Sequence, residues 1–229
     1  MRTAPGMLII GEEASGKTTL LQQTAAKFFL TAPTGCLISI SQATDAGRMK
    51  TQLPAERLIE ANEMIKAGTR DVVDTLVENN AALVVGYKAD EASESNALET
   101  LQAVIMKVLA SSGQINEESP LILALDDFVR IAPRGNALLG LLEGFSAALD
   151  AGGGFIPLIT FEGFFIMEQL LGAKGVMQLT RMGDLVLLRN SSDERAMRLA
   201  QTVGNIDLRS LPKGEGLLIS HAGLEFPAN

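Results

Sequence analysis

The residues best suited to chemistry lie in one short loop near the start of the chain. In the stretch IIGEEASGKTTL, Gly11 is followed by four residues and then by Gly16, Lys17 and Thr18, which is the spacing of a phosphate-binding loop. The loop follows an apolar run and opens a stretch with apolar residues at helical spacing. In such a loop, backbone N–H groups at the start of a helix surround the phosphates. The spacing therefore predicts a nucleotide site rather than a plain glycine turn before a helix.

The residues of this loop have distinct predicted roles. We expect Lys17 to reach the β- and γ-phosphates of ATP and the Thr18 hydroxyl to bind Mg²⁺. The side chains of Glu12 and Glu13 should point away from the site, because carboxylates repel a polyphosphate. The residues expected to contact the nucleotide are Gly11, Glu13, Ala14, Ser15, Gly16, Lys17, Thr18 and Thr19.

A pair of aspartates follows a second apolar run, LILAL. Asp126 and Asp127 would lie at the carboxyl edge of a parallel sheet, where ligands bind in such folds. We predict that Asp126 joins Thr18 in the Mg²⁺ site by holding a metal-bound water, and that Asp127 activates the attacking water. The competing interpretation is that the pair only caps the next helix. The upstream loop favours the first interpretation, so the predicted catalytic residues are Lys17, Asp126 and Asp127.

Short apolar runs alternate with longer amphipathic stretches along the chain, which is typical of a parallel sheet covered by helices. Predicted helices include 16–30, 96–112 and 136–152. The segment 45–78 reads as helices and loops and is expected to be an insertion or a surface element. We therefore expect an α/β fold, with a mostly parallel sheet and helices on both faces, in a single domain over 1–229. The predicted strands are 7–11, 36–41, 82–87, 121–127, 155–161, 184–190 and 216–221.

Composition narrows the class of protein. The chain has 229 residues, of which 47% are hydrophobic, so it can bury one sizeable core. A single cysteine excludes an intramolecular disulfide, and the apolar runs are too short to span a bilayer. We therefore expect a cytoplasmic protein that reaches a membrane only through a partner. A net charge of −8 argues against a generally basic surface that coats nucleic acid.

Together with the phosphate loop, the chain after about residue 120 resembles the motor domain of TraG/TraD-type conjugative coupling ATPases of type IV secretion, in the FtsK/HerA superfamily. The shared features are an acidic strand end followed by an aromatic residue, an LLRN strand, a DERAMRLAQTVG helix and a closing LPKGEGLL strand. The resemblance implies a RecA-like P-loop NTPase fold that uses ATP and Mg²⁺. It also implies a homo-oligomer, by resemblance a hexameric ring, that moves DNA or a secreted protein beside a membrane-anchored partner.

The chain departs from the family pattern at three places. Family members usually have Asp-Glu where this chain has Asp-Asp at 126–127. They also have a glutamine at the end of the next strand, where this chain has Thr160 or Phe161, with Glu162 beside it. Asp150 stands where an arginine that acts across subunits is expected. These departures imply slow hydrolysis, a compact relative of the family, or a nucleotide-binding subunit that no longer pumps.

The same departures leave an arginine finger unassigned and a second function open. Candidates for the finger are Arg130, Arg134 and Arg181. The alternative function is a regulatory RecA-like ATPase, whose nucleotide state gates binding to a secretion or membrane partner without translocation. A third class, the small-molecule P-loop kinases, is disfavoured because the sequence shows no arginine-rich lid after the central strands.

Overall fold

The computed structural model describes residues 6–59, 71–88, 102, 104, 115–132, 136–150 and 154–220. In that part of the chain, eight strands form one sheet in the order β3-β4-β2-β5-β6-β1-β7-β8. Neighbouring strands are parallel, except that β8 runs antiparallel to β7. The strands are β1 (Gly6–Ile10), β2 (Cys36–Gln42), β3 (Leu58–Ile59), β4 (Ala82–Tyr87), β5 (Leu121–Leu125), β6 (Phe155–Phe161), β7 (Gly183–Leu188) and β8 (Gly216–Ile219).

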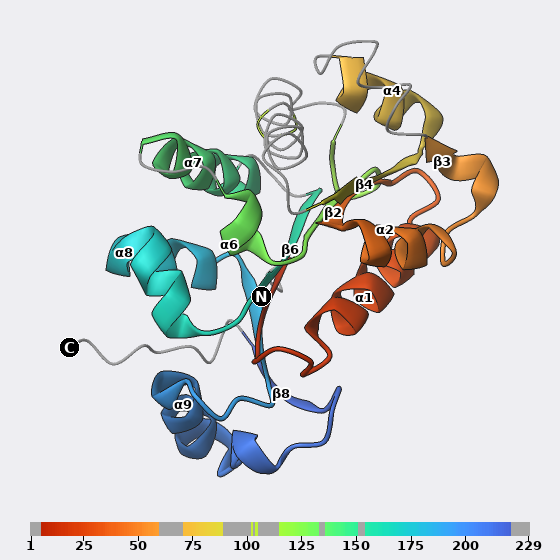
Figure 1. The fold of residues 1–229 in the computed structure, drawn as a ribbon. Coiled ribbons are helices and arrows are strands. Elements are labelled where there is room, and N and C mark those ends of the chain that lie inside the picture. Colours follow the sequence, from red (N-terminus) through yellow and green to blue (C-terminus); the bar gives the residue numbers. More distant parts are fainter. Residues whose placement is uncertain are drawn as a thin grey trace.

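Helices cover both faces of this sheet, which confirms the predicted α/β architecture. Figure 1 shows α1 and α2 against one face, and α6, α7 and α8 against the other. The strands alternate accordingly, since Ile9 of β1 packs with α1 whereas Leu8 and Ile10 pack with α7 and α8. The helices are α1 (Lys17–Thr31), α2 (Ala43–Lys50), α4 (Asp71–Asn79), α6 (Phe128–Ile131), α7 (Asn136–Asp150), α8 (Phe164–Thr180) and α9 (Glu194–Gly204), with short 3₁₀ turns η1 (Ala55–Arg57) and η2 (Leu208–Ser210).

Two sequence predictions concern segments that the structure describes only in part. The segment 45–78 contains most of α2 and α4 and also the short strand β3, which pairs with β4 and extends the sheet at its edge. The strand was not predicted, because two residues carry no readable period. Residues 60–70 of this segment, and almost all of the predicted helix 96–112, lie outside the described residues. None of the helices in the described ranges is both long and apolar enough to cross a membrane.

The topology gathers five connections at one edge of the sheet. Because β1, β5, β6 and β7 are parallel, the loops that follow them all leave from their carboxyl ends. The turn that leads into β8 reaches the same edge, since β8 runs in the opposite direction. The register places Ile10 of β1 beside Phe161 of β6 and Leu187 of β7, so the three strand ends are level. This edge is therefore where residues distant in sequence can form a site.

One buried carboxylate orients two of the helices that border this edge. The side chain of Asp193 accepts hydrogen bonds from the N–H groups of Arg195 and Ala196, both at 3.0 Å, and so caps α9. Its other oxygen accepts a hydrogen bond from the Phe164 N–H at the start of α8. Asp193 is only 7% exposed, so water cannot replace these bonds.

We expect Asp193→Ala to lower the free energy of unfolding by about 3 kcal/mol, because it removes a cap and leaves a buried N–H without an acceptor. Urea denaturation measures this loss. Glu194→Ala is the matched control, since Glu194 forms an exposed pair with Arg198 that contributes little. Equal effects of the two substitutions would contradict the assignment.

Candidate nucleotide-binding site

The phosphate loop connects β1 to α1 and leaves the start of the helix open. Ala14 (φ 59°) and Gly16 (φ 103°) have left-handed backbone conformations, which turn the chain sharply into the helix. Gly16 is the N-cap residue of α1 and provides no side-chain cap, and the first turn contains no acidic residue. The first N–H bonded within the helix is that of Leu20, which donates to the Gly16 carbonyl at 3.0 Å. The preceding N–H groups can therefore receive an anion.

The loop is fixed at its base by the ends of β6 and β7. Gly11 N–H donates to the Phe161 carbonyl at 3.2 Å, and Glu12 N–H donates to the Arg189 carbonyl at 3.1 Å. The Glu12 carboxylate accepts bonds from Arg189 Nε at 2.8 Å and from the N–H and hydroxyl of Ser191 at 2.9 and 2.7 Å. The bonds from Ser191 lower the pKa of Glu12 below its ordinary value of 4.5. Glu12 is thus turned to the end of β7 as a structural anchor.

Lys17 lies folded across this loop. Its Nζ donates to the carbonyl oxygens of Gly11 at 2.6 Å and Glu12 at 2.7 Å. Burial lowers the pKa of Lys17 below its ordinary value of 10.5, while nearby carboxylates, Glu162 first among them, oppose that shift. The Ser15 N–H donates to the Glu12 carbonyl at 3.2 Å, so this group of the predicted cradle is engaged within the loop. The two bonds to carbonyl oxygens hold the Lys17 charge beside the open start of α1.

Thr18 and Asp126 are in contact, although they lie 108 positions apart in the sequence. Thr18 Oγ1 donates to Asp126 Oδ2 at 2.8 Å, and Thr160 Oγ1 donates to Asp126 Oδ1 at 2.9 Å. The Thr160 hydroxyl in turn accepts the Asp127 N–H at 2.8 Å. Asp126 is 4% exposed, and burial raises the pKa of its carboxyl above the ordinary 3.8, with both hydroxyls opposing the shift. The two threonines thus fix the orientation of a buried carboxylate at the site.

The chemistry of these donors fits Mg²⁺. A threonine hydroxyl and a carboxylate are hard oxygen ligands, and Mg²⁺ in nucleotide sites takes few protein ligands because phosphates and waters supply the rest. In the described ranges, no group of three or more His, Cys, Asp or Glu side chains could hold a metal ion. Thr18 and Asp126 would therefore hold the ion together with a bound nucleotide.

Asp127 differs from Asp126 in conformation and partner. It has a left-handed backbone (φ 54°) at the N-cap position of α6, but its side chain makes no capping hydrogen bond. Its Oδ2 instead lies 2.6 Å from Nε of Arg130, one turn later. The carboxylate predicted to activate water is therefore paired with a cation, and its side chain is 22% exposed.

The remaining candidate residues lie in different places. Arg134 lies outside the described residues, and Arg181 follows α8, just before the start of β7 and so at the edge opposite to the phosphate loop. At the end of β6, Thr160 and Phe161 are buried, whereas Glu162 is exposed beside the loop. Sequence reasoning placed Thr160 or Phe161 where a glutamine is usual but missed the contact of Thr160 with Asp126. The contact could have been expected only if the predicted strands 121–127 and 155–161 had been placed side by side in the sheet.

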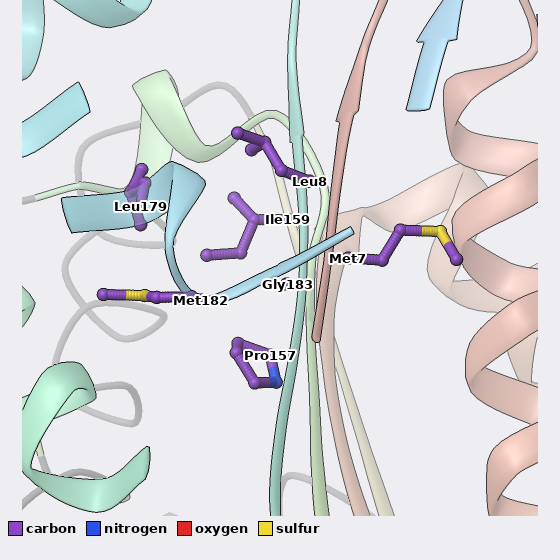
Figure 2. Close-up of a pocket in the computed structure, with 7 residues that line it drawn as sticks. All are labelled: Met7, Leu8, Pro157, Ile159, Leu179, Met182 and Gly183. Atoms are coloured by element: carbon purple, nitrogen blue, oxygen red, sulfur yellow. The ribbon is translucent and has the colours of Figure 1, made fainter. Parts of the chain in front are cut away.

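The described surface is hollowed beside the phosphate loop. This hollow encloses about 280 Å³ and is lined by Glu12, Glu13, Glu162, Gly163, Phe165, Ile166, Ser192 and Asp193. A second cavity, at the opposite edge of the sheet, has only about 10 Å³, close to the space of one water. Figure 2 shows its apolar lining, with Leu8, Ile159, Leu179 and Met182 on one side of the strands and Met7 on the other. The second cavity is a packing gap and offers nothing to a nucleotide.

Known proteins resemble this chain in structure but not in sequence. No protein-family model matches the chain, and no curated protein matches its sequence. The genome packaging NTPase of Sulfolobus turreted icosahedral virus 2, solved with AMP, matches 97% of this chain and 95% of its own, with a TM-score of 0.55 and 12% identity. The chain has the RecA-like P-loop NTPase fold.

Two bacterial ATPases share this fold. ATPases 2 and 3 of Thermomonospora curvata EccC, solved with a signal sequence peptide, match 96% of the chain with a TM-score of 0.58 and 17% identity. This chain spans only 35% of that one. The bacterial conjugative coupling protein TrwB matches 87% of the chain and 73% of its own, with a TM-score of 0.61 and 11% identity. The RecA-like fold expected from the resemblance to FtsK/HerA-type ATPases is thereby confirmed.

Proposed function

We propose that the protein binds ATP with Mg²⁺ in the loop 11–19 and hydrolyses it. The observation that carries this proposal is the 2.8 Å contact of Thr18 Oγ1 with Asp126 Oδ2, beside Lys17 and the open start of α1. A glycine turn with a structural role would not require a hydroxyl, a buried carboxylate and a lysine at one point. The similar viral packaging NTPase has been solved with AMP, AMPPCP and ATP-gammaS, which supports a nucleotide as ligand.

Each residue of the site has a separate role in the proposed hydrolysis. The N–H groups at the start of α1 and the Lys17 ammonium would bind the phosphates, and Thr160 would keep Asp126 in place. A bound Mg²⁺ would supply charge that offsets the negative charge of the phosphates. Asp127 would orient a water and accept its proton while the water oxygen bonds to the γ-phosphorus. The bond to the β–γ bridging oxygen breaks, and the products are ADP and inorganic phosphate.

We further propose that hydrolysis drives an oligomeric motor that moves DNA or protein. The support is the shared fold with a packaging NTPase, a secretion ATPase and a conjugative coupling protein. By the same resemblance the working form is a cytoplasmic homo-oligomer, a hexameric ring, that meets a membrane-anchored secretion partner. The test is steady-state phosphate release with and without DNA, combined with light scattering in the presence of nucleotide. Hydrolysis that rises with DNA and with assembly supports the motor.

A specific observation favours the second candidate, a regulatory ATPase that gates binding to a secretion or membrane partner. Asp127 is held by Arg130, and β6 ends in the buried Thr160 and Phe161 rather than in a side chain that reaches the γ-phosphate. Both features slow turnover without preventing binding. Tight nucleotide binding with negligible phosphate release, whether DNA is added or not, would favour this function over the motor.

Arg130→Ala separates a restraining role of Arg130 from a catalytic one. Because the substitution frees the Asp127 carboxylate from a partly exposed ion pair, we expect kcat to rise roughly two- to fivefold. Single-turnover phosphate release measures the change. A large fall in kcat would instead show that Arg130 contacts the phosphates, and Arg198→Ala, which breaks an exposed pair elsewhere, is the control.

A further inference from the structure

The turn 212–215, which leads into β8, packs directly on the phosphate loop. Gly214 N–H donates to the Ser15 carbonyl at 2.9 Å. A Cβ added to Gly16 would lie 3.1 Å from the Gly214 Cα and 3.9 Å from the Lys213 Cγ. Gly16 and Gly214 both have a positive φ, of 103° and 85°, so glycine permits both turns. The side chain of Lys213 therefore starts beside the N-terminus of α1.

The order of the strands shows which part of a nucleotide this turn would face. Thr18 and Asp126 mark the position of Mg²⁺, and hence of the β- and γ-phosphates. Asp126 follows β5, whereas the turn precedes β8, and β1 lies between these strands in the sheet. A nucleotide that has its γ-phosphate near Asp126 and its phosphates along the loop would have its nucleoside end on the other side of the phosphate loop. That side is the side of the turn 212–215.

Among the described residues beside the phosphate loop, Lys213 is a cation that takes part in none of the ion pairs found there. Arg130 pairs with Asp127, Arg189 with Glu12 and Arg209 with Asp207. Lys213 is exposed and has no ion-pair or hydrogen-bond partner for its ammonium group among the described residues. The remaining methylenes of its side chain allow the ammonium group to reach a phosphate bound at the start of α1.

We propose that Lys213 is a second phosphate-binding cation that contacts the α-phosphate end of the bound nucleotide, with the turn 212–215 forming a wall of the nucleoside subsite. This inference rests on the proposed function, because it requires a nucleotide in the loop. The contact lies outside the segment 11–19 that the sequence predicts to bind the nucleotide. A cation at the α-phosphate acts equally on nucleotides with two or three phosphates.

The test compares dissociation constants for ADP and AMPPCP, measured by calorimetry on the whole chain. Lys213→Gln should weaken both ligands about tenfold and by the same factor, because one charge-assisted bond is lost. Lys213→Arg should keep most of the affinity, since it keeps the charge. Lys174→Ala removes an exposed charge from α8 and should change neither constant. The fall of affinity with added salt should also be shallower in Lys213→Gln.

Each other outcome contradicts a definite part of the account. If the wild type binds both ligands and Lys17→Ala does not, but Lys213→Gln binds like Lys174→Ala, the role of Lys213 is wrong and the proposed function stands. If Lys213→Gln weakens AMPPCP alone, the lysine contacts the γ-phosphate and the assignment to the α-phosphate end is wrong. If the wild type binds neither ligand, both proposals fail.

Discussion

Lys17→Ala will hydrolyse ATP at least about a hundredfold more slowly than the wild type, because it removes a preorganised cation from the position where phosphate charge develops. The ammonium group is already held at this position by the carbonyl oxygens of Gly11 and Glu12. Its lowered pKa reflects burial, so the charge acts in a less polar environment than water. Steady-state phosphate release at saturating ATP measures the effect.

The control for this substitution is Lys27→Ala. Lys27 lies on the exposed side of the same helix. Lys27→Ala therefore changes the net charge by the same amount as Lys17→Ala and makes the same substitution in α1, but it leaves the loop unchanged. We expect the control to retain wild-type turnover. Equal rates for Lys17→Ala and the wild type would show that hydrolysis in the preparation does not come from this site.

Asp126→Asn is expected to reduce Mg²⁺-dependent hydrolysis about a hundredfold, since an amide holds a Mg²⁺-bound water less strongly than a carboxylate does, and to do so without loss of stability. Burial raises the pKa of Asp126, so the folded state favours the protonated carboxyl. This preference stabilises the folded state below the ordinary pKa of 3.8. The stabilisation is lost as the pH rises through the raised pKa. At neutral pH the ionised carboxylate therefore costs stability, and asparagine removes this cost.

The measurement is a pair of thermal melts, at pH 7 and at mildly acidic pH, beside phosphate release. The variant should melt at the same temperature as the wild type or higher at pH 7, and the difference should shrink as the pH falls. A variant that melts much lower at pH 7 would show that Asp126 is mainly a structural residue. Asp184→Asn, at a half-buried carboxylate in β7, is a control for the substitution itself.

The fold was largely predictable because its signals are local. Each predicted strand overlaps an observed one, since buried parallel strands are continuous apolar runs. The phosphate loop was predictable for the same reason, as its glycines, lysine and threonine are consecutive or nearly so. Strand β3 was missed because its two residues are defined by pairing with β4 and not by their own pattern.

The connections within the site were harder to predict, because they depend on how distant segments meet. Nothing in the sequence joins Glu12 to Ser191, or the turn at Gly214 to Ser15, since both contacts arise from the sheet order around β1. The pair of Asp127 with Arg130 has a helical spacing, but the left-handed backbone of Asp127 at the start of α6 is not indicated by the sequence. The candidate residues could therefore be named from the sequence, whereas the contacts that already engage some of them depend on the fold.

The central claim is that Lys17, Thr18 and Asp126 form a site for ATP with Mg²⁺. The most direct test is isothermal titration calorimetry of the wild-type chain with ATP, once with Mg²⁺ and once with EDTA. We predict saturable binding of one nucleotide per chain that is tighter with Mg²⁺, because Thr18 would add a ligand for the ion and Asp126 would hold a water bound to it. No saturable binding under either condition, or binding that is indifferent to Mg²⁺, would contradict the account.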